Sequence, residues 1–222
     1  MKHLSPVRLA AVLAVAASIP VAGETPPAAP FASGERLRYE VVWPSGLSLG
    51  EAEFSAHSTT GGWRFEAELT AGLPNLQIRE NYRATTDAEL CSQELSKKFR
   101  RGAREGGETV AFDQRKNRAR RVTDDGGGES ELDIPPCARD ALTFLYFVRQ
   151  DLARGRIPPP DEINLGAQYF ITLTYAESLR IQVAGEPREA DRILVDVSGP
   201  QARHSFEVFF GKDAARTPLL VK

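Results

Sequence analysis

The sequence has few of the residues from which metal centres and redox sites are most often built. Only three histidines and two cysteines occur among its 222 residues. His3 lies at the very start, and His57 and His204 do not have the spacing of metal ligands. Cys91 and Cys137 are too far apart in the sequence for a CxxC redox or zinc motif. We therefore predict no metal ion, no cofactor and no catalytic residue of these types.

Motifs of phosphate binding and serine hydrolysis are also missing or incomplete. No glycine-rich loop opens a helix, as a phosphate-binding loop requires. Gly46–Gly50 matches the GxSxG string of a nucleophile elbow, but an elbow needs a helix after its serine. The residues after Gly50 alternate like a strand, so we expect a hairpin turn in which Ser48 does no chemistry. A glycosidase stays open as an alternative, because its two carboxylates can be assembled from distant parts of the chain.

Long apolar runs are absent after the first 23 residues. A positively charged start precedes the apolar run Leu9–Val21, and Val21–Gly23 provides small residues for cleavage. The alternative is a membrane anchor, but the run is short for a span and Pro20 interrupts it. Residues 1–23 are therefore predicted to be a cleaved signal peptide of an exported protein.

The rest of the chain divides into a short lead-in and one domain. Residues 24–33 are rich in proline and alanine and are expected to be flexible. Residues 34–222 suit a single β-rich domain. Export to an oxidising compartment favours a disulfide between Cys91 and Cys137, and the alternative is two buried thiols. A bridge would close a loop of more than forty residues. It would contribute on the order of 3–4 kcal/mol to stability.

Alternation of apolar and polar residues dominates this domain. In Trp63–Leu69 and in His204–Phe210, for example, every second residue is apolar, which is typical of half-buried strands. About a dozen such segments follow one another with short polar turns. The sequence therefore predicts a mainly β fold, a curved antiparallel sheet or open barrel of about a dozen strands packed around one central helix.

The central helix is predicted within Ile134–Gly155. Asp140 can cap its start, Arg149 and Arg154 would face the negative end of its dipole, and Gly155 can end it. Apolar side chains cover more than half of its circumference, so we expect the sheet to bend around it. These side chains belong to Ala141, Leu142, Phe144, Leu145, Phe147, Val148 and Leu152.

Basic residues crowd between residues 97 and 121, where a hairpin with Gly106 and Gly107 near its tip is expected. One interpretation is a docking surface for an anionic partner such as phospholipid head groups, acidic glycans or a protein, rather than nucleic acid. The other is a solvated hairpin whose charges are balanced by the acidic stretch from Asp124 to Glu131. The candidate docking residues are Lys97, Lys98, Arg100, Arg101, Arg118, Arg120 and Arg121.

Four segments in the same order resemble the domain of unknown function 3108 family of exported bacterial proteins. They are residues 34–54 (GERLRYEVVWPSGLSLGEAEF), 111–119 (AFDQRKNRA), 134–155 and 209–222. Within the last two segments the matching positions are Asp140, Leu142, Tyr146, Arg149, Asp213, Arg216 and Pro218. The resemblance implies a β-rich periplasmic domain and brings no catalytic residues with it. The family usually carries another strand after the position of Lys222, so the last sheet edge is expected to be exposed.

A looser analogy is to lipoprotein carriers of the Lol type, in which a half-open barrel holds lipid beside a helix. We therefore expect a non-catalytic envelope protein that binds an apolar or amphiphilic ligand, or an envelope protein, in its concave sheet. Peripheral membrane contact is compatible with this expectation, and a hydrolase of envelope glycans or esters is the alternative. The candidate ligand-binding residues, each of which could equally be simple core, are Tyr39, Trp43, Trp63, Phe65, Phe144, Tyr169 and Phe206.

Overall fold

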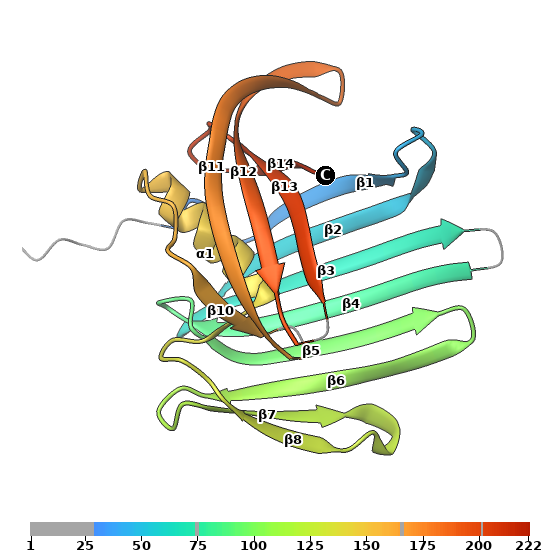
Figure 1. Cartoon of the computed structure of the whole chain (residues 1–222), viewed down its shortest axis with the longest axis vertical. Helices are drawn as coiled ribbons and strands as arrows, with labels where there is room; N and C mark the ends of the chain where they lie inside the picture. The colour runs from blue at the N-terminus through green and yellow to red at the C-terminus, as the bar shows by residue number, and fades with distance from the viewer. Residues whose placement is uncertain (1–28, 74–75, 165–166, 201) are drawn as a thin grey trace, which may run out of the picture.

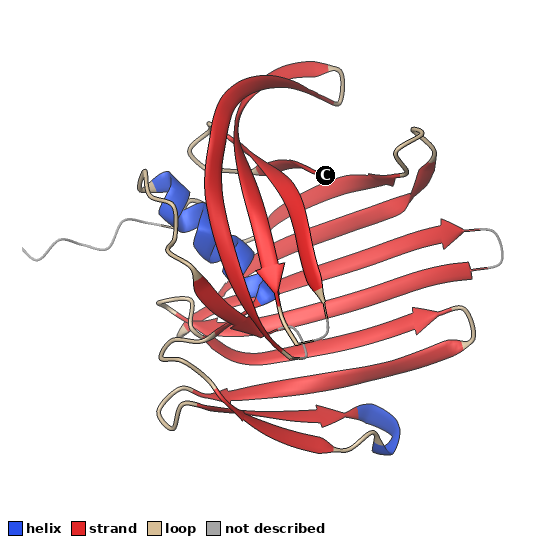
Figure 2. Cartoon of the chain, viewed as in Figure 1, coloured by secondary structure: helices blue, strands red, loops and turns tan. Residues whose placement is uncertain are grey.

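The computed structural model describes residues 29–73, 76–164, 167–200 and 202–222, and the predicted signal peptide lies outside these ranges. Two mainly antiparallel sheets and one α-helix make up this part of the chain (Figures 1 and 2). The predicted mainly β fold with a single helix is confirmed. The strands form two separate sheets, and neither closes into a barrel in the described part of the chain.

The larger sheet is an eight-stranded meander in which each strand pairs with the next one in the sequence. Glycine at positive φ allows two of its tight turns, at Gly46 (φ 88°) and Gly102 (φ 62°). The β5–β6 turn is therefore at Gly102, and the expectation of a tip at Gly106 and Gly107 is wrong, because both lie within β6. The strands are β1 (Glu35–Val42), β2 (Ser48–Thr59), β3 (Gly62–Leu73), β4 (Leu76–Asp87), β5 (Ser92–Arg101), β6 (Arg104–Asp113), β7 (Arg118–Thr123) and β8 (Glu129–Asp133), with a 3₁₀ turn at Asp124–Gly126.

The smaller sheet has six strands in the order β14-β13-β12-β11-β10-β9. Its pairs are antiparallel except β9 with β10, which run parallel because the helix connects them. In Figure 1 this sheet lies across the larger one, and the long hairpin β11–β12 extends beyond it. The strands are β9 (Arg139–Asp140), β10 (Asp161–Asn164), β11 (Gln168–Val183), β12 (Glu186–Ser198), β13 (Arg203–Gly211) and β14 (Pro218–Val221).

Helix α1 (Ala141–Ala153) lies between the sheets and packs on both. Leu142 and Tyr146 belong to the core with the larger sheet, whereas Phe144, Val148 and Leu152 belong to the core with the smaller one. A helix that serves two sheets needs apolar residues around much of its circumference, as its sequence has. The prediction of a central helix is therefore confirmed. One apolar side of the helix packs on the larger sheet and the other packs on the smaller sheet.

The ends of α1 follow the expected signals with one exception. The Asp140 carboxylate accepts hydrogen bonds from the backbone N–H groups of Leu142 and Thr143, both at 2.9 Å. Gly155 (φ 73°) adopts the left-handed conformation that ends the helix. Arg149 does not interact with the helix dipole as expected. It is fully buried, and its guanidinium forms an ion pair with Glu35 of β1 at 2.6 Å.

One disulfide and one set of aromatic contacts join parts of the chain that are distant in the sequence. Cys91 and Cys137 form a disulfide with a Cα–Cα distance of 4.6 Å, so the sequence-based pairing agrees with the structure. Phe31, in the segment expected to be flexible, is 4% exposed and packs edge-on against Trp63, Phe65 and Tyr146. The packed core thus takes in a residue of the predicted lead-in.

Candidate functional site

The face of the larger sheet that packs on α1 is called the inner face below. Along the strands, this face passes from packed core to an open groove. On β5, Leu95 is buried, Lys97 and Phe99 are half-buried, and Arg101 is exposed. These four residues are on one face because side chains alternate along a strand. Helix α1 covers only one end of this face, where it contacts β3 and β4. The remaining length of the inner face is left without a covering helix.

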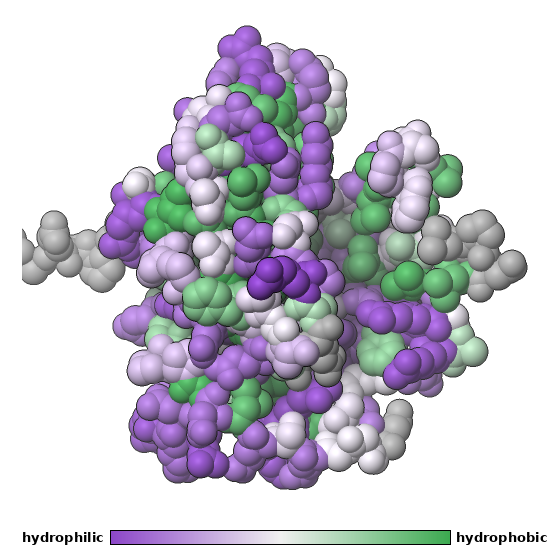
Figure 3. Space-filling model, in the orientation of Figure 1, coloured by the Kyte–Doolittle hydropathy of each residue, from purple (hydrophilic) through white to green (hydrophobic). Residues whose placement is uncertain are grey.

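An apolar groove of about 290 Å³ forms where α1 stops covering the sheet. Its floor comes from β2, β3, β4 and β5, and its wall from the first turns of α1. Figure 3 shows hydrophobic surface inside a recess between the sheets, with hydrophilic surface along its lower side. The residues that line the groove are Ala52, Phe54, Ala67, Glu68, Leu69, Glu80, Tyr82, Leu95, Ala141, Leu142 and Leu145.

One ionised carboxylate, Glu80, lies at the border of this apolar groove. Tyr82 donates a hydrogen bond to it at 2.5 Å, and Arg101 Nε donates another at 2.8 Å. Burial opposes ionisation of Glu80, but these hydrogen bonds outweigh it and hold the pKa of the carboxyl below its usual range. Burial and the hydrogen bond to Glu80 also raise the pKa of the Tyr82 hydroxyl. Glu80 is therefore a charged group whose charge Arg101 already balances.

Beyond Glu80, three cationic side chains gather around the ring of Phe99. The Lys97 amine lies 5.9 Å from the ring centroid, and the guanidinium carbons of Arg101 and Arg104 lie 5.5 Å and 6.0 Å from it. Lys97 also lies 5.4 Å from the ring of Tyr82, which lines the groove. The groove is therefore apolar at one end and cationic at the other.

The seven residues proposed as ligand-binding do not gather in one place. Phe65, Phe144, Trp63, Tyr169 and Phe206 pack in or against the two cores around α1. Trp43 is 56% exposed beside the β1–β2 turn. Tyr39 comes nearest to the groove, because its ring packs edge-on against Phe54 at 5.6 Å. Its hydroxyl donates to the backbone oxygen of Pro218 at 2.7 Å and so links β1 to β14.

The basic residues proposed as one docking surface lie on two faces of the sheet. Lys97, Arg101 and Arg121 share the inner face with Leu95 and Val110. The other four, Lys98, Arg100, Arg118 and Arg120, project from the outer face. On the outer face, acidic neighbours balance three of these charges, through Arg100–Glu105, Arg118–Glu131 and Arg120–Glu129 ion pairs. Pairs this exposed contribute little to stability, as expected for a solvated surface.

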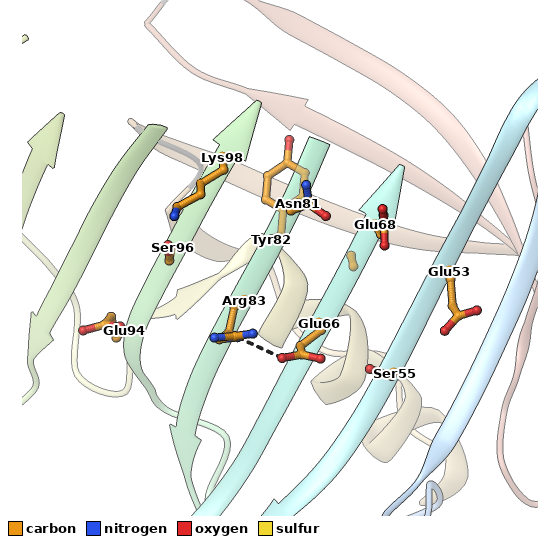
Figure 4. A pocket seen from close by; sticks show the side chains of 11 residues that line it. Glu53, Ser55, Glu66, Glu68, Asn81, Tyr82, Arg83, Glu94, Ser96 and Lys98 are labelled. Carbon is orange, nitrogen blue, oxygen red and sulfur yellow. Dashed lines mark hydrogen bonds and ion pairs between the residues drawn. The ribbon is translucent and has the colours of Figure 1, made fainter. Parts of the chain in front are cut away.

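The outer face also carries a polar hollow of about 460 Å³ (Figure 4). Carboxylates from β2, β3 and β5 project into it, on the side of the sheet away from α1. Hydrogen bonds and charge from Arg38 and Arg36 hold the pKa of Glu53 below its usual range. Glu66 is paired with Arg83 at 2.8 Å. A glycosidase needs one carboxyl with a raised pKa as its acid, and the arginine contacts of Glu53 have the opposite effect on its pKa.

Other catalytic and metal-binding arrangements find no support in the described residues. Ser48 opens strand β2 opposite Val42, and β3 rather than a helix follows that strand, as predicted for a hairpin. His57 lies at the other end of the same strand. Within the described ranges, no three His, Cys, Asp or Glu side chains are placed to hold a metal ion. No helix in those ranges is long and apolar enough to span a bilayer.

Sequence reasoning missed most of the groove. Ala52, Leu69 and Tyr82 lie in the alternating runs and give no sign of being anything but core. The signal that could have found the site was the appearance of charges at inward positions of β4 and β5. Glu80, Lys97 and Arg101 occupy positions at which an ordinary core strand would have apolar residues.

A family model described as "Protein of unknown function (DUF3108)" matches residues 38–222. This agrees with the resemblance seen in the four sequence segments. No curated protein and no solved structure matches the chain. The matched range begins within β1 and takes in all the later strands and α1, so it includes both sheets and the whole groove.

Proposed function

The chain belongs to the DUF3108 family of proteins of unknown function, and we propose that it is an exported, periplasmic protein that binds an amphiphilic ligand without catalysing a reaction. The observation that carries the proposal is the apolar groove beside α1. Its volume of about 290 Å³ is near the lower end of the range of small-molecule sites, about 300–1,000 Å³. Such a volume suits one narrow apolar chain.

The groove supports binding rather than catalysis because of what lines it. Nine of its eleven lining residues are alanine, leucine, phenylalanine or tyrosine. Its buried carboxylate, Glu80, is ion-paired with Arg101 and accepts a hydrogen bond from Tyr82. These contacts occupy the carboxylate and leave it unsuited to act as a general acid or base. An apolar groove bordered by charge matches the two chemical parts of an amphiphile.

Export is supported by the signal-peptide features of residues 1–23 and by the cysteine pair. A disulfide persists in oxidising compartments and is rare in the cytosol. Native mass spectrometry of protein isolated from its own periplasm tests both parts of the proposal. We expect a chain that begins near Glu24 and carries a co-purified amphiphile. A chain that retains residues 1–23 would contradict export.

A variant that fills the groove tests the binding site directly. Ala52 is half-buried in the groove floor, so Ala52→Phe should occupy the space of the ligand and lower the affinity for dodecyl maltoside at least about tenfold. Ala111→Phe is the matched control, because Ala111 is exposed on the outer face of β6. Isothermal titration below the micelle concentration measures both, and thermal unfolding checks the fold.

If Ala52→Phe does not fold, Leu69→Gln serves in its place, because it makes the groove floor polar without adding much volume. Unchanged affinity in a folded groove variant would refute the groove as the binding site. An equal loss in Ala111→Phe would refute it as well.

A further inference from the structure

We propose that the cationic end of the groove selects an amphiphile with a carboxylate head group, that is, a long-chain fatty acid. This inference rests on the proposed amphiphile binding and adds the charge and position of the head group. The cluster that carries it consists of Lys97, Phe99, Arg101 and Arg104 and is called the Phe99 cluster below. Its members are consecutive inward positions of the β5–β6 hairpin.

The Phe99 cluster has more positive charge than its carboxylates can balance. Arg101 is paired with Glu80, and Arg121 on the neighbouring strand is paired with Glu108. Among the described residues, neither Lys97 nor Arg104 has a carboxylate within ion-pair distance, although Lys97 lies opposite Glu108 and its charge helps to lower the pKa of Glu80. Two uncompensated cations within 6.0 Å of one ring centroid repel each other and the paired Arg101. A bound anion would remove this repulsion.

Phe99 provides the aromatic ring that the three cationic side chains share. Its ring lies over Gly106, the residue opposite it on β6, where a Cβ atom would be only 3.0 Å from the ring. Glycine at this position therefore leaves room for the end of the Phe99 ring. An aromatic ring with cations beside it offers hydrogen-bond donors to a carboxylate and an apolar contact to the carbon atoms next to that carboxylate.

The Phe99 cluster adjoins the apolar groove, so one molecule can occupy both. Lys97 is two residues from Leu95 and directly opposite Tyr82, and both of these line the groove. Two residues along a strand correspond to about 7 Å. An acyl chain lying in the groove would thus bring its head group to Lys97, and Arg104 lies near the same Phe99 ring. Two unpaired cations can balance one small anionic head group but not the many charges of a polyanion, and the adjoining apolar floor suits an acyl chain.

Three amphiphiles with the same twelve-carbon chain separate the head group from the chain. They are laurate (anionic), dodecyltrimethylammonium (cationic) and dodecyl maltoside (neutral), titrated calorimetrically below their micelle concentrations. We expect laurate to bind at least about tenfold more tightly than the cation. Added sodium chloride should weaken laurate binding and leave dodecyl maltoside unaffected, since salt screens charges at exposed sites.

The double variant Lys97→Met/Arg104→Gln removes the two uncompensated cations. We expect it to lose about tenfold in laurate affinity, because charge-assisted hydrogen bonds are lost, and to bind dodecyl maltoside as before. Lys98→Met/Arg100→Gln is the matched control, with the same changes on the outer face of the same β5–β6 hairpin. It should bind laurate as the unmodified protein does.

The possible results distinguish this inference from the proposed function. One possible result is that dodecyl maltoside binds, that Ala52→Phe abolishes this binding, and that laurate binds no more tightly than dodecyltrimethylammonium. The groove is then supported as the binding site, and the head-group inference is overturned. Unchanged laurate affinity in Lys97→Met/Arg104→Gln overturns it too. If none of the three amphiphiles binds, the proposed function and this inference both fail.

Discussion

Arg149 lies where helix α1, strand β1 and the turn before β14 meet. Its guanidinium makes two parallel hydrogen bonds to Glu35, at 2.6 and 2.8 Å, and two to the backbone oxygen of Ala215, at 3.1 and 3.0 Å. The rings of Phe31 and Tyr146 lie 5.3 and 5.2 Å from it. Glu35 belongs to the larger sheet, and Ala215 precedes the last strand of the smaller one. One side chain therefore connects both sheets to the helix.

We expect Arg149→Gln to lower the free energy of unfolding by about 3–5 kcal/mol, because it leaves Glu35 without its partner in a largely buried site. Arg38→Gln is the control. Arg38 pairs with Glu53 on the outer face at 2.7 Å and is mostly exposed, so its loss should cost less than about 1 kcal/mol. Urea titration measures both. Equal effects of the two substitutions would mean that the Arg149 pair does not hold the sheets together.

At the scale of elements, different side chains of α1 pack against the smaller sheet and form the wall of the groove. Phe144 is 3% exposed and packs against the smaller sheet. Leu145, the next residue, is half-buried and forms part of the groove wall. The sequence treats both as core positions of one helix, and only Phe144 is fully enclosed. Loss of the Phe144 side chain should therefore have other consequences than loss of the Leu145 side chain.

Phe144→Ala should destabilise the fold by about 3–5 kcal/mol, because it leaves a cavity between the helix and the smaller sheet. Leu145→Ala should cost clearly less, about 1–2 kcal/mol, since its side chain already borders open space. It should also change dodecyl maltoside affinity, which Phe144→Ala should not do while folded. Denaturant titration and calorimetry decide this. A Leu145→Ala variant as unstable as Phe144→Ala would show that the groove wall is in fact packed core.

At the scale of the whole molecule, the disulfide ties the larger sheet to the segment that starts the helix. Cys91 precedes β5, and Cys137 precedes β9, with 46 residues of separation in the sequence. Ser92 continues the connection, because its hydroxyl donates to the buried Asp140 carboxylate at 2.6 Å. The same carboxylate caps α1. The junction between sheet and helix thus has one covalent link and one buried hydrogen-bond network.

Replacing both cysteines by alanine should therefore lower stability by about 3–4 kcal/mol, mainly by freeing the unfolded chain. Urea titration of the double variant, beside the intact protein with and without reductant, measures this. The reduced protein should match the double variant. Labelling of two free thiols in protein isolated without reductant would contradict the bridge.

The sequence by itself determined the classes of structure in this protein. Period-two alternation predicted the strands, and helical spacing between Asp140 and Gly155 predicted the helix with its cap and its end. Four ordered segments predicted the family. These features are local, because strand faces, helix faces and caps depend on residues within a few positions of one another. The even number of cysteines allowed only one intramolecular pair.

The tertiary structure alone decided where those elements leave space and which charges meet. Glu35 and Arg149 are 114 residues apart in the sequence, so no local pattern predicts their pairing. The basic residues between 97 and 121 looked like one surface, but strand register sends neighbours such as Lys97 and Lys98 to opposite faces. The groove exists because α1 covers only part of the larger sheet. How far a helix reaches over a sheet depends on long-range packing, and alternation within a strand carries no information about it.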